Sequence, residues 1–402
     1  MFCISPTPVV GTFKAPPSKP LSQRYIFAAA IAEGVTTVGP LELSDDVTAA
    51  LRAVLPLSRI ELEGDFAKMA RRDPDRVRAF NVGDSGFTLR VSTALYAGIK
   101  GVTVIYTSEQ LSRRPLEDLV EALRIYADIS WSPGVIRIES PGARRIEVSI
   151  RGDVTSQYIS GLMYLSAAVE GGGRIRVLGG TKSWQYVVAT AEVIKKFGGR
   201  VKMEDGDIYV EGPLKSPGRA EVPGDYALSS FLMVGAAITG GRVEVTGLGG
   251  EVDRAILDIL REAGVYVKEH EDRVVVEGTA SRPFEVDLSN APDLAPPAAL
   301  LASFIPGRSR LKGVEHLAYK ESNRIETISD VVSRLGAYVD YKDGVLSVEG
   351  PPRAKNVEFK CHRDHRICLM ALTAARSVGG CVNDVSSLAK TWPSALLYFS
   401  AR

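Results

Sequence analysis

Basic residues recur next to turn residues that precede apolar, helix-forming runs. Lys19 and Arg24 flank Pro20, which fits the first turn of a helix because its missing N–H costs nothing there. Residues 81–90 (NVGDSGFTLR) form a second, Gly-rich turn entering a helix, and residues 113–115 (RRP) form a third. The free N–H groups and dipole at a helix N-terminus attract anions, and nearby cations add to the attraction. The spacing predicts sites for small anions, although each segment alone also fits an ordinary capped helix with solvated cations.

Further polar residues suit neutral hydrogen bonding and proton transfer. The segments TSQY (residues 155–158) and SWQY (183–186) carry hydroxyls and amides of the kind that bind a polyol, with helix capping as the simpler explanation. In the C-terminal half, Lys320 and Arg324 are four residues apart and are expected to share one helix face. Glu321 beside them is a candidate acid or base, with a solvated ion-pair surface as the alternative.

Two motifs are set aside. Residues 83–86 (GDSG) resemble the nucleophile segment of trypsin-like proteases, but those enzymes place a His before the Ser, and no His precedes His270. Cys361, His365 and Cys368 are expected to share a helix face, yet they lack the fourth ligand of a structural zinc, and the arginines between them would repel a cation. We therefore expect no metal. The four scattered cysteines predict no disulfide framework, and hence a reducing cytoplasm.

Composition narrows the class of protein. The 402 residues carry 49 Lys and Arg against 48 Asp and Glu, a net charge of +1, which argues against a nucleic-acid-binding surface. No apolar run reaches the ~18 residues of a membrane span, so no membrane partner is expected. Asn occurs five times and Gln four times, and the scarcity of these thermolabile amides indicates a thermophilic source.

The elements that must position these residues repeat along the chain. Three stretches, which begin at Gly172, Gly240 and Pro306, have the same order of patterns: a strand with alternating apolar residues, a segment with helical spacing of apolar residues, a Gly and two short strands. In the first and third stretches, the two short strands are joined by Asp-Gly, a tight-turn dipeptide. Weaker copies give a period of about 70 residues. We predict an α/β (α+β) protein of six βαβαββ modules, three in each of two domains. Because the last copy is truncated, an N-terminal strand from Phe2 to Val10 is expected to complete it, giving domains at 1–17 plus 225–402 and at 18–224.

Taken in order, the polar segments resemble a known family. They are similar to the signature segments of the enolpyruvyl transferases, most nearly the branch whose acceptor is shikimate 3-phosphate. From residue 18 to residue 393 the segments are SKPLSQR, GDSGFTLR, RRPLEDL, TSQY, SWQY, APD, KESNRIE, DHR and KTWP. The resemblance implies two domains of three modules each, with the active site in the cleft between them. It also implies transfer of the enolpyruvyl group of phosphoenolpyruvate to the 5-hydroxyl of shikimate 3-phosphate by addition and elimination, with release of phosphate, in chorismate and aromatic amino-acid biosynthesis.

The family's functional residues carry over position by position. Asp293 would take the proton of the 5-hydroxyl, and Glu321 with Lys19 would protonate the methylene carbon and later remove a proton. The residues implied for shikimate 3-phosphate are Lys19, Arg24, Thr155, Ser156, Gln157, Ser183, Tyr186, Asp293 and Lys320. Those implied for phosphoenolpyruvate are Lys19, Gly86, Arg114, Gln157, Arg324, Arg366 and Lys390. No cofactor is implied, and we expect a cytoplasmic monomer whose domains close on two small polyanions.

The chain departs from the family pattern at a few positions, and two alternatives stay open. The departures are Pro20, Phe87, His316 and Asn323, where Ser, Thr, Asn and Asp are usual, and Pro296–Pro297, which are expected to shorten or displace a helix. One alternative is a related transferase with a UDP-sugar acceptor, which commonly has a Cys in the loop that is Thr107–Arg114 here; this loop has none. The other is a non-catalytic binding module built from the same repeats, which would have no reason to keep these charged residues.

Overall fold

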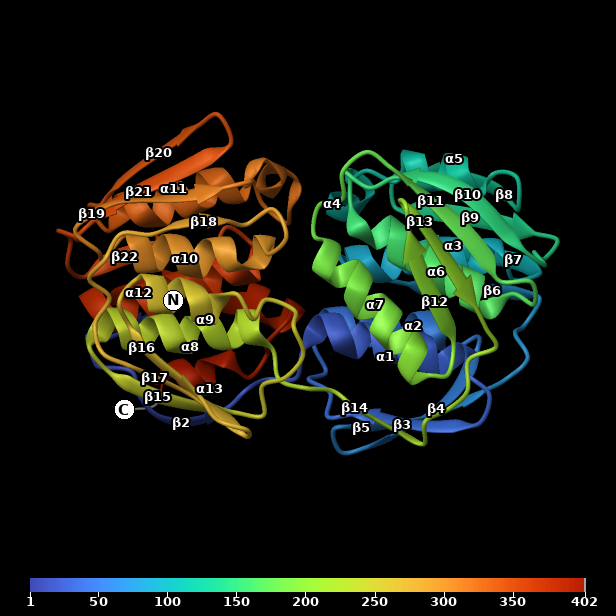
Figure 1. Cartoon of the computed structure of the whole chain (residues 1–402), viewed down its shortest axis with the longest axis horizontal. Coiled ribbons are helices and arrows are strands. Elements are labelled where there is room, and N and C mark those ends of the chain that lie inside the picture. The colour runs from blue at the N-terminus through green and yellow to red at the C-terminus, as the bar shows by residue number, and fades with distance from the viewer. Residues whose placement is uncertain (401–402) are drawn as a thin grey trace. The chain divides into compact units, whose positions relative to one another are not determined.

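The computed structural model describes residues 1–400. The chain divides into two compact units: one is Lys19–Val222, and the other joins residues 1–18 to the chain from Pro223 onward. Within the described residues the strands form six sheets, three in each unit, in agreement with the six modules predicted from the repeats (Figure 1).

The unit Lys19–Val222 contains the module in its complete form. β10 (Ile146–Arg151) pairs in parallel with β11 (Gly173–Leu178), and the hairpin of β12 (Arg200–Glu204) and β13 (Asp207–Glu211) extends the sheet in the order β10-β11-β13-β12. The other two sheets have the matching orders β6-β7-β9-β8 and β14-β3-β5-β4. The remaining elements of this unit are α1 (Lys19–Ile31), β3 (Val35–Gly39), α2 (Asp45–Val54), β4 (Ser58–Glu63), β5 (Phe66–Arg71), β6 (Val77–Asn81), α3 (Gly86–Ala97), β7 (Gly101–Tyr106), α4 (Glu109–Ser112), α5 (Glu117–Leu123), β8 (Asp128–Ser132), β9 (Val135–Ser140), α6 (Ser156–Ala168), α7 (Trp184–Lys196) and β14 (Arg219–Glu221).

The N-terminal residues supply strands to two modules of the other unit. β1 (Phe2–Ile4) pairs antiparallel with β23 (Gly380–Asn383) and completes the truncated last copy. The N-terminal donor is thus confirmed, but its predicted extent, Phe2 to Val10, is wrong. The chain leaves the sheet after Ile4, and β2 (Val10–Lys14) pairs in parallel with β15 (Arg242–Thr246). Two prolines, at positions 6 and 8, lie in the break, and proline has no N–H to give to a sheet ladder.

The remaining elements of this unit follow the same module path. Its sheets have the orders β16-β17-β15-β2, β18-β19-β21-β20 and β1-β23-β22. Their elements are α8 (Tyr226–Thr239), α9 (Ile256–Glu262), β16 (Tyr266–Glu269), β17 (Arg273–Glu277), β18 (Glu285–Asp287), the 3-10 helix η1 (Pro292–Leu294), α10 (Ala295–Ala302), β19 (Gly307–Lys312), η2 (Glu315–Tyr319), α11 (Arg324–Arg334), β20 (Tyr338–Lys342), β21 (Val345–Gly350), β22 (Val357–Lys360), α12 (His365–Val378), η3 (Val385–Lys390) and α13 (Ala395–Ser400).

Helices form the core of each unit. In α3, every residue from Gly86 to Ala97 is buried, and in α8 every residue from Tyr226 to Ile238 is buried. The sheet strands expose alternate residues, as in β10, where Ile146, Val148 and Ile150 are buried and their neighbours are exposed. The sheets therefore cover central helices. None of the helices in residues 1–400 is long and apolar enough to cross a membrane.

The expectation that the cysteines form no disulfides is wrong. Cys3 is bonded to Cys381, which joins β1 to β23, and Cys361 is bonded to Cys368. The first pair is 378 residues apart in sequence, so only the fold reveals it. Cys361 also precedes α12, so the helix face that it was expected to share with His365 and Cys368 does not exist. Among the described residues, no cluster of metal-ligating side chains occurs.

Candidate active site

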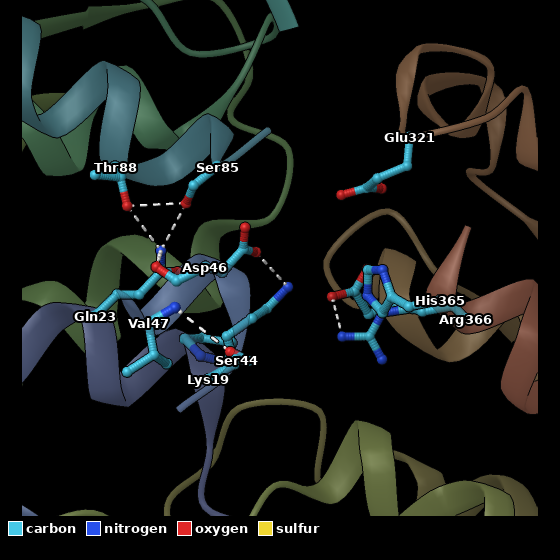
Figure 2. A network of polar contacts seen from close by, with 12 residues as sticks. Lys19, Gln23, Ser44, Asp46, Val47, Ser85, Thr88, Glu321, His365 and Arg366 are labelled. Atoms are coloured by element: carbon cyan, nitrogen blue, oxygen red, sulfur yellow. Dashed lines mark hydrogen bonds and ion pairs between the residues drawn. The ribbon is translucent and has the colours of Figure 1, made fainter. Parts of the chain in front are cut away.

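Three buried helices of the unit Lys19–Val222 are linked by side chains in their first turns. The amide of Gln23 in α1 donates to the hydroxyls of Ser85 and Thr88 at the start of α3, at 3.0 Å in each case (Figure 2). Nη1 of Arg90 in α3 donates to Oε1 of Gln157 at the start of α6, at 2.9 Å. The positive ends of three helix dipoles therefore lie in one region, which favours negative charge there.

Two guanidinium groups meet at Gly86, the first residue of α3. A Cβ atom at this position would lie 2.8 Å from Nη1 of Arg90 and 3.0 Å from Nη1 of Arg114. Arg90 also donates to the carbonyl oxygens of Gly86, at 3.2 Å, and Pro115, at 2.9 Å, which ties the loop of Arg114 to the helix start. Nε of Arg114 is buried without a hydrogen-bond partner. The missing side chain of Gly86 thus leaves room for two cations at a helix N-terminus, an arrangement suited to an anion.

Lys19 begins α1 and is held by a carboxylate that the sequence did not reveal. Its Nζ lies 3.0 Å from Oδ2 of Asp46, in the first turn of α2 (Figure 2). Asp46 is fixed in turn, because its carbonyl accepts from Gln23 at 3.2 Å and Ser44 caps the same helix through the N–H of Val47. The only sequence signal was the helix start Ser-Asp-Asp. An anion that binds Lys19 must compete with Asp46.

Arg24 is buried rather than open to solvent. Its Nε donates to Thr190 at 2.9 Å, its Nη1 to the carbonyl of Pro20 at 2.8 Å, and its Nη2 to the carbonyl of Tyr186 at 3.0 Å. The rings of Phe87 and Tyr186 lie 4.5 and 5.5 Å from the guanidinium carbon. Burial lowers the pKa of Arg24 to about 10, so it is charged at neutral pH. Phe87, a departure from the family pattern, thus provides a stacking surface for this arginine.

The hydroxyl residues predicted to bind a polyol lie at the starts of α6 and α7. Thr155 caps α6, since its hydroxyl accepts the N–H of Gln157 at 3.3 Å, and Ser156 is the first residue of that helix. Ser183 precedes α7 with a φ of 58°, a left-handed conformation that is uncommon for a residue with a side chain. Tyr186 lies one turn further, against Arg24. Thr155 therefore caps its helix, whereas the hydroxyl of Ser183 makes no capping hydrogen bond.

In the other unit, Arg324 binds three carboxylates. Its Nη1 lies 2.9 Å from Oδ1 of Asp293, its Nη2 lies 2.8 Å from Oε2 of Glu321, and its Nε lies 2.9 Å from Oδ2 of Asp364. Nη2 of Arg366 reaches the second oxygen of Asp293 at 2.6 Å. The structure thus brings together four predicted site residues and adds Asp364, which was quoted in the DHR segment without a role. With two arginines and three carboxylates, this network carries one net negative charge.

Burial makes this network electrostatically strong. The side chains of Arg324 and Asp364 are 1% and 0% exposed. Burial alone would lower the pKa of Arg324, but Asp364, Glu321 and Asp293 outweigh it and raise that pKa above its ordinary value. Asp364 also caps α12, because its Oδ1 accepts the N–H of Arg366 at 2.9 Å. One carboxylate therefore positions both arginines.

The other predicted residues of this unit have a different local structure from that expected. Lys320 and Glu321 lie in an extended loop before α11, which begins only at Arg324, so the helix face predicted for Lys320 and Arg324 is wrong. Ser322 in that loop donates to Asp364 at 3.0 Å instead of capping the helix. Lys390 ends η3, which packs on α12. The helix after Asp293, α10, has eight residues, and its two prolines lie in the first turn, where a missing N–H costs nothing.

The comparisons with known proteins decide the family. A family model described as EPSP synthase (3-phosphoshikimate 1-carboxyvinyltransferase) matches residues 4–396. The chain belongs to the EPSP synthase family. The 3-phosphoshikimate 1-carboxyvinyltransferase of Caldivirga maquilingensis is 37% identical over 392 residues, which are 94% of each chain. That of Korarchaeum cryptofilum is 32% identical over 414 residues, covering 98% of this chain and 97% of the relative.

Membership of the EPSP synthase family confirms the resemblance seen in the sequence. A solved EPSP synthase from Acinetobacter baumannii has the same fold, with a TM-score of 0.83 at 24% identity, over 99% of this chain and 97% of that chain. This likeness confirms the predicted fold class. Relatives from thermophilic archaea agree with the scarcity of Asn and Gln. Neither the UDP-sugar transferase nor the non-catalytic module is favoured by the names of these relatives.

Proposed function

We propose that this chain catalyses the reaction for which its relatives are named. The carboxyvinyl (enolpyruvyl) group of phosphoenolpyruvate passes to the 5-hydroxyl of shikimate 3-phosphate, phosphate is released, and 5-enolpyruvylshikimate 3-phosphate enters the shikimate pathway. The observation that carries the proposal is the pair of guanidinium groups at Gly86, at the start of α3. Phosphoenolpyruvate carries a phosphate and a carboxylate, and arginine binds both groups with two parallel hydrogen bonds.

The proposal assigns the two substrates to the residues expected from the sequence. Shikimate 3-phosphate contacts Lys19, Arg24, Thr155, Ser156, Gln157, Ser183, Tyr186, Asp293 and Lys320. Phosphoenolpyruvate contacts Lys19, Gly86, Arg114, Gln157, Arg324, Arg366 and Lys390. The helix N-termini support this assignment, because the residues contributed by α1, α3 and α6 are linked by hydrogen bonds within one unit. We add Arg90 and Asp46 as residues that position Arg114 and Lys19.

The acid and base of the reaction are Asp293 and Glu321. In the addition step Asp293 removes the proton of the 5-hydroxyl, and the 5-oxygen of shikimate 3-phosphate bonds to C2 of phosphoenolpyruvate. Glu321 with Lys19 supplies a proton to C3. In the elimination step Glu321 with Lys19 removes a proton from C3 as the C2–O bond to phosphate breaks, and the proton held by Asp293 leaves with the phosphate. Arg324 supports these roles, since it holds both carboxylates at 2.9 and 2.8 Å. Protons taken and given balance within each step, so no cofactor is needed.

A phosphate-release assay tests the proposed reaction. The purified chain should release one phosphate for each 5-enolpyruvylshikimate 3-phosphate formed from phosphoenolpyruvate and shikimate 3-phosphate, and none with UDP-N-acetylglucosamine as the acceptor. Release with the UDP-sugar alone would instead favour the related transferase. No release with either acceptor would refute catalysis.

Substitution of Glu321 separates binding from proton transfer. Glu321→Gln should bind both substrates but turn over at least about 100-fold more slowly, the usual contribution of an acid or base. Glu326→Gln is the matched control, since Glu326 is exposed on α11 of the same unit. Equal rates in the two variants would remove Glu321 from the mechanism.

The same proposal includes a monomer that acts in the cytoplasm. The disulfides do not argue against this compartment, because intracellular proteins of hyperthermophiles commonly contain them. Light scattering of the purified chain should give the mass of one 43.3 kDa chain. A dimer mass at micromolar concentration would contradict the monomer.

A further inference from the structure

A disulfide spans the segment that carries Asp364 and Arg366. Cys361 follows β22, Cys368 lies in the first turn of α12, and the two are bonded. Both residues are buried, at 1% and 0% exposed. The bond therefore closes a short loop whose members include two residues of the Arg324 network, and it does so inside the unit rather than at its surface.

The backbone enclosed by this bond is strained. His362 and Arg363 have φ values of 53° and 55°, so two consecutive residues with side chains adopt the left-handed conformation. Such residues cost free energy and persist only where their surroundings hold them. The turn is closed by the N–H of Asp364, which donates to the carbonyl of Cys361 at 2.9 Å. Asp364 thus follows directly from a turn that requires support.

The non-covalent support of the turn is modest. The N–H of Cys361 donates to Oδ1 of Asn383 over a long 3.4 Å, and Nε2 of His362 lies 2.9 Å from Oδ2 of Asp330, both groups being partly exposed. Asp364 connects the turn to α12, because it caps the helix and its carbonyl accepts the N–H of Cys368 at 2.9 Å. The disulfide adds a covalent connection between Cys361, at the start of the turn, and Cys368 in the helix.

Asp364 contacts both arginines, through the side chain of Arg324 and the backbone of Arg366. Its Oδ1 accepts the N–H of Arg366 at 2.9 Å, and its Oδ2 lies 2.9 Å from Nε of Arg324. Both arginines also bind Asp293, which carries the proposed base. We propose that the Cys361–Cys368 disulfide is a positioning element of the active site, which fixes the turn before Asp364 and so orients Arg324 and Arg366. The inference rests on the proposed function of those residues.

The chemistry of the bond is thiol–disulfide exchange. It forms when the two thiols react with an oxidised dithiol or glutathione disulfide, which accepts two electrons and two protons and leaves as two thiols. Dithiothreitol reverses the reaction, giving the thiols of Cys361 and Cys368 and the cyclic disulfide of the reagent. The state of the bond is therefore under experimental control without a substitution in the network.

The test uses the full chain with Cys3→Ala and Cys381→Ala, so that Cys361–Cys368 is the disulfide that responds. Because both cysteines are buried, the chain is reduced by dithiothreitol in denaturant and refolded with the reductant present, and mass spectrometry after alkylation identifies the two thiols. The reduced chain should have a kcat/KM for phosphoenolpyruvate about 10- to 100-fold lower, the effect of a small misplacement of binding groups. Reoxidation with glutathione disulfide should restore it. A chain that also carries Cys361→Ala and Cys368→Ala should show the lowered value and no response to dithiothreitol.

Other outcomes would overturn the inference. Equal kcat and KM in the oxidised and reduced forms, with only a lower melting temperature on reduction, would show that the bond is merely structural. An oxidised chain without activity would refute the proposed function, and the positioning role with it. The alanine variants could lose activity while reduction of the parent has no effect. That result would assign the loss to the missing side chains and not to the bond.

Discussion

The Cys3–Cys381 disulfide predicts a large loss of stability when it is removed. The bond joins β1 to β23 at directly opposed positions, since Cys3 is the register partner of Cys381. The double variant Cys3→Ala, Cys381→Ala keeps the backbone ladder between these strands. It removes only the covalent link between the two ends of one folded unit, so its effect isolates the cross-link from the sheet.

The magnitude follows from the length of chain that the bond closes. With 378 residues between the cysteines, the loop-closure relation for a cross-linked unfolded chain gives ~6 kcal/mol at 25 °C. The unit Lys19–Val222 begins and ends at neighbouring points, because the N–H of Ser18 donates to the carbonyl of Pro223 at 2.8 Å. If this unit stays folded while the other unfolds, its residues no longer lengthen the closed loop, which is then about half as long. The figure then falls only to ~5 kcal/mol, since it depends on the logarithm of length. Measured values are usually smaller, so we expect ~3–5 kcal/mol and a melting temperature lower by roughly 10 °C.

Calorimetry without reductant measures this difference directly. Both chains should carry Cys361→Ala and Cys368→Ala, so that the other disulfide does not contribute, and dithiothreitol should bring the parent to the melting temperature of the variant. Phosphate release at 25 °C should not differ between the two chains. Melting temperatures within 1–2 °C of each other, or two free thiols at these positions in the native parent, would refute the reasoning.

Three further outcomes are expected. Gly86→Ala should raise KM for phosphoenolpyruvate about tenfold in steady-state kinetics, because the added Cβ displaces the two guanidinium groups there; an unchanged KM would contradict the anion site. Asp364→Asn should lower the free energy of unfolding in urea by ~3 kcal/mol, since it removes the buried charge facing Arg324, whereas a change below ~1 kcal/mol would count against that pairing. The hydrogen bond from Arg261 is the chief cause that lowers the pKa of Glu269 in the folded chain. Ionised Glu269 therefore stabilises the fold at pH values above its ordinary pKa of about 4.5, and this stabilisation is lost as the pH falls through the lower pKa of the folded state. The difference in the free energy of unfolding between wild type and Glu269→Gln should therefore shrink from pH 6 to pH 3. A difference that stays constant over this range would contradict the prediction.

Much of the fold could be read from local signals. The Asp-Gly dipeptides predicted two hairpins, and both are present with positive φ at each turn residue: 51° and 82° at Asp205 and Gly206, and 50° and 77° at Asp343 and Gly344. Only this turn geometry matches the twist of the paired strands, so the signal is specific. The repeat of that pattern was enough to predict the modules.

Long-range contacts could not be predicted in the same way. Helix α11 begins at Arg324, so Lys320 lies outside it, and the hydroxyl of Ser322 before the helix bonds to Asp364, 42 residues away. Asp46 and Asp364 have the local pattern of helix caps, and nothing near them in sequence reveals that they hold Lys19 and Arg324. The Cys3–Cys381 pair, 378 residues apart, was missed for the same reason. Residue type and spacing identified the chemistry, but the partner of each charge is decided by the tertiary fold.

The strand exchange at the N-terminus has a consequence for synthesis of the protein on the ribosome. The unit Lys19–Val222 is continuous and can fold as soon as Val222 has emerged. Phe2–Ile4 precede this unit in the chain and pair with Gly380–Asn383, which follow it. At ~5–20 residues per second they wait roughly 20–75 s for that partner. During this interval the apolar strand is exposed in the cell beside a unit that has already folded, so it is the segment of the nascent chain that a chaperone would be expected to protect.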